Sequence, residues 1–200
     1  MKAGRLIATS LTAMAAVAAQ AAIVITAGPG NWPNDENVLF NEEGLIASGP
    51  LVQGITNQSN FIVDFYDAGE DLVTPPGGQA RVEAVDGAFT DLKLQLDQPG
   101  ATFDTLIWNL NAKANGNVTF TIERTGGPNH VESFALDRAG ENWFRFEAIG
   151  ESMISARLHT DVELQDVRQV RLGNVVPEPA TITALLLGAA GFFARRKRKP

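Results

Sequence analysis

Cysteine is absent from this chain of 200 residues, and histidine occurs only twice. Without cysteine the fold must hold without disulfides, and a cysteine nucleophile, thiolate metal sites and thiol redox chemistry are excluded. His130 and His159 are the only histidines, and no serine lies in a Gly-x-Ser-x-Gly setting, so the residues of common hydrolase triads are scarce. We therefore expect that the protein is not an enzyme and has no catalytic residues.

Hydrophobic runs are short and lie at the two chain ends. Near the N-terminus, two basic residues precede the alanine-rich run Leu6–Ala19, and Ala19-Gln20-Ala21 has the small-x-small pattern of a cleavage site. This layout predicts that the first 21 residues form a secretory signal helix, which implies the Sec translocon and signal peptidase as partners. We place the cleavage after Ala21, with Ala18 or Ala22 as alternatives.

At the C-terminus, Pro177-Glu178-Pro179 precedes the uncharged run Ala180–Ala194. A helix of these 15 residues covers roughly 22 Å at about 1.5 Å each, against about 30 Å of bilayer hydrocarbon, so the run predicts a short transmembrane helix. Because lysine and arginine resist translocation, the basic end should act as a cytoplasmic stop-transfer cluster. This cluster consists of Arg195, Arg196, Lys197, Arg198 and Lys199.

The tail resembles the PEP-CTERM sorting signal of exported bacterial proteins, through Val176–Thr181, Leu185–Gly188, Gly191–Phe193 and the basic end. The resemblance implies that Pro177, Glu178 and Pro179 form a motif recognised by an exosortase, a transpeptidase-like membrane protease, and that residues 177–200 are removed or exchanged. It also implies an inner-membrane intermediate, followed by the cell surface or extracellular matrix of an exopolysaccharide-producing organism. The alternative is a permanent C-terminal anchor.

Between the two signals lie 155 residues, Ala22–Val176, enough for one domain with a real core. This region contains nine basic and 22 acidic residues, a net charge of −13. Such a surface argues against nucleic acid and anionic membranes as partners, and it could attract divalent cations.

Alternation of apolar and polar residues predicts an all-β domain. Leu92, Leu94 and Leu96 share one face of a segment, and Val118, Phe120 and Ile122 share one face of another. Turn sequences separate these segments at short intervals, and Asn115-Gly116 predicts a hairpin. Together the pattern predicts an antiparallel β-sandwich or jelly roll without a long amphipathic helix.

Candidate ligand sites are few. Asp64, Asp67, Glu70 and Asp71 form the densest acidic cluster, and calcium prefers several oxygen ligands of this kind, so the cluster is a candidate calcium site; no other cofactor is expected. Trp32, in a loop rich in glycine and proline, and Tyr66 are candidate platforms for sugar rings. Trp108 lies in an apolar alternation typical of a core, whereas Trp143 is out of phase with its phenylalanine neighbours and should face outward.

The resemblance of the tail to the PEP-CTERM family implies an exported structural or adhesive protein of the cell surface or exopolysaccharide matrix, with weak glycan binding. One alternative is an exported carbohydrate-active hydrolase, which would need a carboxylate pair in a cleft. The other is an envelope protein that keeps its C-terminal anchor.

Overall fold

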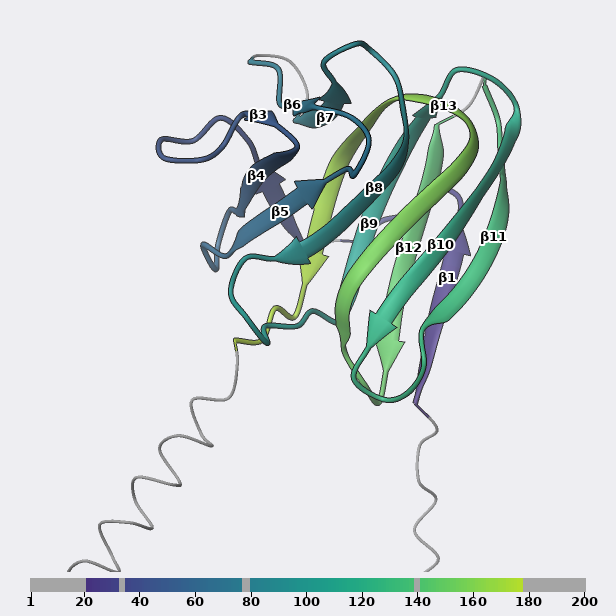
Figure 1. The fold of residues 1–200 in the computed structure, drawn as a ribbon. Coiled ribbons are helices and arrows are strands. Elements are labelled where there is room, and N and C mark those ends of the chain that lie inside the picture. Colours follow the sequence, from purple (N-terminus) through teal and green to yellow (C-terminus); the bar gives the residue numbers. More distant parts are fainter. Residues whose placement is uncertain (1–20, 33–34, 77–79, 139–140, 178–200) are drawn as a thin grey trace, which may run out of the picture.

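The computed structural model describes residues 21–32, 35–76, 80–138 and 141–177, and these are all-β, as predicted (Figure 1). The described residues contain no helix, and so none that is long and apolar enough to cross a membrane. The predicted signal helix and transmembrane helix lie outside this part of the chain. The strands are β1 (Ala22–Ala27), β2 (Glu36–Leu39), β3 (Ser48–Gly49), β4 (Leu51–Thr56), β5 (Ile62–Tyr66), β6 (Leu72–Val73), β7 (Arg81–Ala84), β8 (Phe89–Leu96), β9 (Thr105–Ala112), β10 (Gly116–Arg124), β11 (His130–Leu136), β12 (Asn142–Ile149) and β13 (Met153–Gly173).

The strand β13 organises the sheet, because its two halves pair with different neighbours. Its first half, to His159, lies between β8 and β10, and its second half, from Leu164, pairs with β9 on one edge and with β7 and β2 on the other. From β2 the pairing continues through β4 and β5 to β8 and so returns to β13. Instead of two separate sheets, the two layers are therefore parts of one antiparallel sheet with barrel-like closure.

The core lies between these layers and is built from the residues that alternation placed on inner faces. Phe120 on β10 is 0% exposed and touches the rings of Phe144 and Phe146 on β12 at centroid distances of 4.8 Å each. Trp108 on β9 is also 0% exposed and lies 5.5 Å from Phe146. Edge-to-face aromatic packing of this kind fixes β10 against β12 and β9 across the core.

The predicted Asn115-Gly116 hairpin is wrong. The two strands that flank it, β9 and β10, do not pair, because β9 lies between β12 and β13 whereas β10 lies between β13 and β11. The connection instead crosses from one layer to the other. Gly116 is needed for close approach, since a Cβ there would overlap the side chains of Asp161 and Val162.

Candidate functional site

The predicted sorting motif begins directly where the fold ends. Val176 forms an isolated antiparallel bridge with Thr102, with backbone N···O distances of 2.9 and 2.8 Å in the two directions, and the next residue, Pro177, is exposed. Glu178, Pro179 and the stop-transfer cluster lie outside the described residues. The sorting tail therefore leaves the domain with no spacer between the last sheet contact and the motif.

The predicted signal cleavage site lies at the same end of the molecule. Ala21 immediately precedes β1, while Ala19 lies outside the described residues. Ala22 pairs with Ile149 at the end of β12, and the turn that follows leads to Met153, which bridges Phe103 next to Thr102. Both predicted export signals thus adjoin the same edge of the domain, the lower end in Figure 1.

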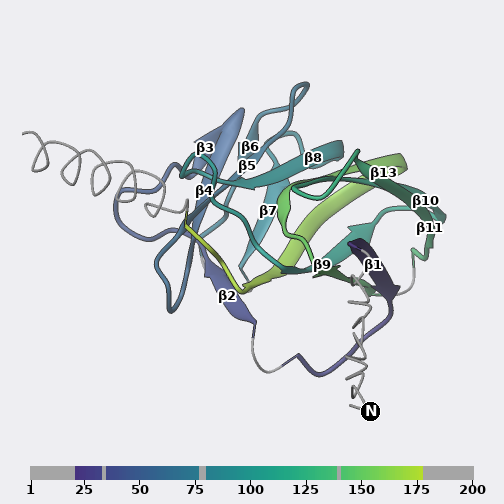
Figure 2. The ribbon, with the colours of Figure 1, turned by 90° about the horizontal axis from the view of Figure 1, so that it is seen from below.

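Trp32 and Trp143 lie together on the outer side of the β12–β9 layer. Their ring centroids are 5.9 Å apart with the planes inclined by 47°, and both residues are half-buried. Trp143 faces outward as predicted, since Phe144 and Phe146 on the same strand point into the core. Trp32 comes from the segment that leaves β1 and passes outside this layer toward β2 (Figure 2).

Tyr66 lies on the outer face of the other layer, so the structure does not bring it together with Trp32. Its strand pairs it with Lys93 on β8, and the Lys93 ammonium lies 5.5 Å from the Tyr66 ring centroid. The Tyr66 hydroxyl is 3.5 Å from Gln95 Oε1. A single tyrosine beneath a lysine offers less free ring surface than the tryptophan pair does.

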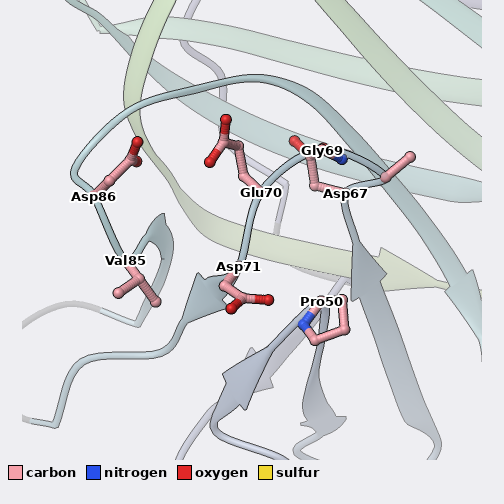
Figure 3. Close-up of a pocket in the computed structure, with 8 residues that line it drawn as sticks. Pro50, Asp67, Gly69, Glu70, Asp71, Val85 and Asp86 are labelled. Atoms are coloured by element: carbon pink, nitrogen blue, oxygen red, sulfur yellow. The ribbon is translucent and has the colours of Figure 1, made fainter.

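The acidic cluster predicted as a calcium site is divided by the structure. Asp67, Glu70 and Asp71, joined by Asp86, line a pocket of about 440 Å³ beyond the end of β5 (Figure 3). Figure 3 shows the Glu70 and Asp86 carboxylates on one side of the loop and that of Asp71 directed away from them. Among the described residues no three acidic or histidine side chains are placed to hold one metal ion, so calcium binding stays a prediction.

Asp64, the fourth member of that cluster, lies apart within β5. Its side chain is on the outer face of the sheet yet the residue is only 7% exposed, and Oδ1 accepts a hydrogen bond of 2.9 Å from Gln53 Nε2. Burial raises the pKa of Asp64, the hydrogen bond from Gln53 opposes this, and the charge of Asp97 adds to the increase. Asp64 is therefore a buried carboxylate with a raised pKa, and it does not line the pocket.

Sequence reasoning missed an arginine cluster on the same outer face as the tryptophan pair. Arg145 on β12 and Arg171 on β13 are the two cross-strand neighbours of Ile107 on β9, and Trp143 and Arg168 flank Asn109 in the adjacent row. The Nε atoms of all three arginines are buried without a hydrogen-bond partner among the described residues. Arg145 and Arg168 form ion pairs with Glu147 and Asp166, so Arg171 is the member of this cluster without an ion pair among the described residues.

A second pocket, of about 260 Å³, opens beside Arg171 where β13 changes partner from β7 to β2. The ladder is irregular between Arg168 and Arg171, and Gln169 in this bulge has φ = 54°, which is uncommon for a residue other than glycine. The lining residues are Asn37, Val38, Leu39, Ala80, Gln169, Val170 and Arg171. Among them Arg171 carries the only charge.

Neither histidine lines one of the two pockets or lies on the strands β12 and β9. His159 pairs with Asp91 within β13, and its Nδ1 is 3.5 Å from Asp91 Oδ2. His130 begins β11, and its Nε2 is 3.2 Å from Glu132 Oε2. Neither histidine contacts a serine or threonine hydroxyl in a hydrogen bond among the described residues.

Comparison with known proteins bears on the tail alone. The family model described as the PEP-CTERM protein-sorting motif matches residues 175–199. No curated protein and no solved structure matches the chain. The motif indicates export toward the cell surface and processing by exosortase-type machinery in general. The resemblance of the tail to the PEP-CTERM signal is confirmed, and the chain carries a PEP-CTERM sorting motif that starts two residues after its last strand.

Proposed function

We propose that this exported protein is a structural or adhesive component of the cell surface or exopolysaccharide matrix, and that it binds glycan weakly through the outer face of β12 and β9. The sorting motif supports the location. One observation supports the binding face: Trp32 and Trp143 meet on the outside of a sheet, with ring centroids 5.9 Å apart. Aromatic rings on a rigid sheet present large apolar faces on which sugar rings stack.

The tryptophans also supply the assay, because they are two of the three in the chain and the third, Trp108, is 0% exposed. Titration of the exported protein with exopolysaccharide from its own host should change the intrinsic tryptophan fluorescence. Trp143→Ala should weaken the binding about 5- to 140-fold, the effect expected for about 1–3 kcal/mol of lost stacking. Tyr66→Ala is the matched control, since it removes an aromatic ring from the opposite layer. Equal binding by the parent protein and Trp143→Ala would refute the proposed face.

The pocket beyond β5 favours a second candidate function, an exported carbohydrate-active hydrolase. Four carboxylates line this pocket, and glycosidases use two carboxyl groups as acid and as nucleophile or base. We favour binding without turnover, because the tryptophan pair lies on a different face from this pocket. Release of reducing ends from the host polysaccharide, abolished by Glu70→Gln, would establish the hydrolase instead.

A further inference from the structure

We propose that the pocket beside Arg171 binds the carboxylate of an acidic sugar, so that the glycan taken by the tryptophan face is a uronate-containing polysaccharide. This inference rests on the proposed function and names the class of its ligand. Three observations carry it: an arginine without a partner, a pocket without a carboxylate, and a bulge that builds the pocket next to the tryptophan pair.

Arg171 stands apart from the other basic residues of the domain. Six of the nine form ion pairs with carboxylates, Lys93 lies over the Tyr66 ring, and Arg138 is exposed at a turn. Arg171 is half-buried, and it makes no ion pair or side-chain hydrogen bond with any described residue. A guanidinium that has lost water around Nε and gained no acceptor is stabilised by an incoming anion.

Glu36, the cross-strand partner of Leu172, does not neutralise this site. Glu36 adjoins Asn37, which pairs with Arg171, but its Oε2 accepts hydrogen bonds from the backbone N–H groups of Gln58 and Ser59 at 2.9 and 2.7 Å. Burial would raise the pKa of Glu36, yet these hydrogen bonds outweigh it and lower the pKa, so this carboxylate stays charged and engaged with the 57–60 turn. Glu36 therefore does not form an ion pair with Arg171.

The lining of the pocket matches a carboxylate carried on a sugar better than a bare anion. Asn37 and Gln169 offer amide groups beside the guanidinium, which can bind a carboxylate through two parallel N–H groups. Leu39 and Val170 provide apolar wall on the same cavity. The volume of about 260 Å³ lies just below the roughly 300–1,000 Å³ of drug-sized sites, and so suits one substituted ring.

The bulge connects this pocket to the tryptophan pair. Gln169 Oε1 accepts a hydrogen bond of 3.0 Å from Asn109 Nδ2, and Asn109 is the cross-strand neighbour of Trp143. Arg171 lies two strand spacings from Trp143, about 10 Å, and two residues further along the strands, about 7 Å, which gives a separation of about 12 Å. A sugar chain that stacks on Trp143 can therefore place the acid group of a following residue in the pocket.

The test uses the exported protein, trigalacturonate, and the methyl ester of trigalacturonate, which keeps the rings but removes the charge. We expect the acid to bind at least 10-fold more tightly than the ester at low salt, and Arg171→Gln to remove that difference while ester binding persists. Arg157→Gln, which changes an arginine on the opposite layer, should leave the preference intact. Acetate should compete only at far higher concentration, because it lacks the ring.

The outcomes distinguish failure of the carboxylate pocket beside Arg171 from failure of the proposed glycan-binding face. Equal binding of acid and ester, lost in Trp143→Ala, would overturn the carboxylate pocket but keep the glycan face, whereas no binding of either ligand would overturn both. Acetate competing as strongly as trigalacturonate would overturn the uronate assignment. A thermal melt tests for misfolding. Because Arg171 has no ion pair or side-chain hydrogen bond among the described residues, Arg171→Gln and Arg171→Lys should melt within about 2 °C of the parent, whereas replacement of an arginine that stabilises the fold would lower Tm further.

Discussion

Release of the sorting tail should depend on opening the bridge between Val176 and Thr102. Proteases bind extended peptide in a cleft, and here the residue next to the motif is still held in the sheet by two backbone hydrogen bonds. Each such bond contributes about 0.5–1.5 kcal/mol net, so opening the bridge costs about 1–3 kcal/mol. If cleavage requires the open form, the available motif is reduced about 5- to 140-fold.

The perturbation is a Gly-Ser-Gly-Ser-Val insertion after Val176, which frees the motif and restores a valine ahead of Pro177. Five residues add at most about 17 Å of extended chain between the bridge and the motif. The rate of tail removal in the native host should then rise by up to about 5- to 140-fold, the cost of opening the bridge. The rate is measured as the conversion of precursor to processed protein in a pulse-chase experiment. The same five residues inserted after Gly44, in an exposed turn with φ = 88°, control for insertion itself.

Equal rates for the two insertions and the parent would refute the reasoning, because the protease would then accept the motif from the bridged state. Glu178→Ala provides the uncut reference, since it removes the only acidic side chain of the tail. If the parent itself keeps residues 180–200 and stays in the inner membrane, the tail is a permanent anchor, and neither insertion should change it.

The remaining predictions concern stability. Phe120→Ala should cost about 3–5 kcal/mol and lower Tm by about 6–20 °C in circular dichroism melts; a change under 3 °C would contradict the core described above. The raised folded-state pKa of Asp64, caused by burial and by Asp97, means that its charge costs stability as pH rises above the ordinary value of 3.8; Asp64→Asn should therefore raise Tm at pH 7, with the gain vanishing below pH 4. Asp161→Asn should change Tm in the opposite direction, because hydrogen bonds from Asn117 lower the pKa of Asp161 and so its charged form stabilises the fold: Tm should fall slightly at pH 7. Identical changes in Tm for Asp64→Asn and Asp161→Asn would refute both assignments.

Much of the strand arrangement could be read from alternation, because a sheet with one buried face imposes period two on the chain. The inner faces of β8 and β10 and the outward position of Trp143 follow from that period alone. The closure through β13 could not be read in this way, since alternation shows which face a residue occupies but not which strand lies beside it. The Asn115-Gly116 prediction failed for the same reason, as a turn signal does not specify the pairing partner.

The sequence contains an indication of the pocket beside Arg171 that the alternation of apolar and polar residues alone does not show. Val167, Val170 and Leu172 are all buried, so two residues, Arg168 and Gln169, stand between apolar positions where a regular strand has one. An extra residue in an otherwise alternating strand indicates a bulge, and bulges redirect side chains and interrupt pairing. The bulge could thus be predicted from sequence, but the loss of every partner for Arg171 could not, because it depends on where Glu36 finds its hydrogen bonds.

The position of the two predicted export signals bears on whether glycan binding depends on removal of the tail. Ala22 and Val176 adjoin the same end of the domain, the lower end in Figure 1, whereas the pocket lined by Asp67, Glu70, Asp71 and Asp86 lies beyond the end of β5. The tryptophan face lies along the side of the sheet, parallel to the strands, and so stays open in either state. We therefore expect glycan binding to be equal before and after tail removal, which separates the adhesive role from the sorting step.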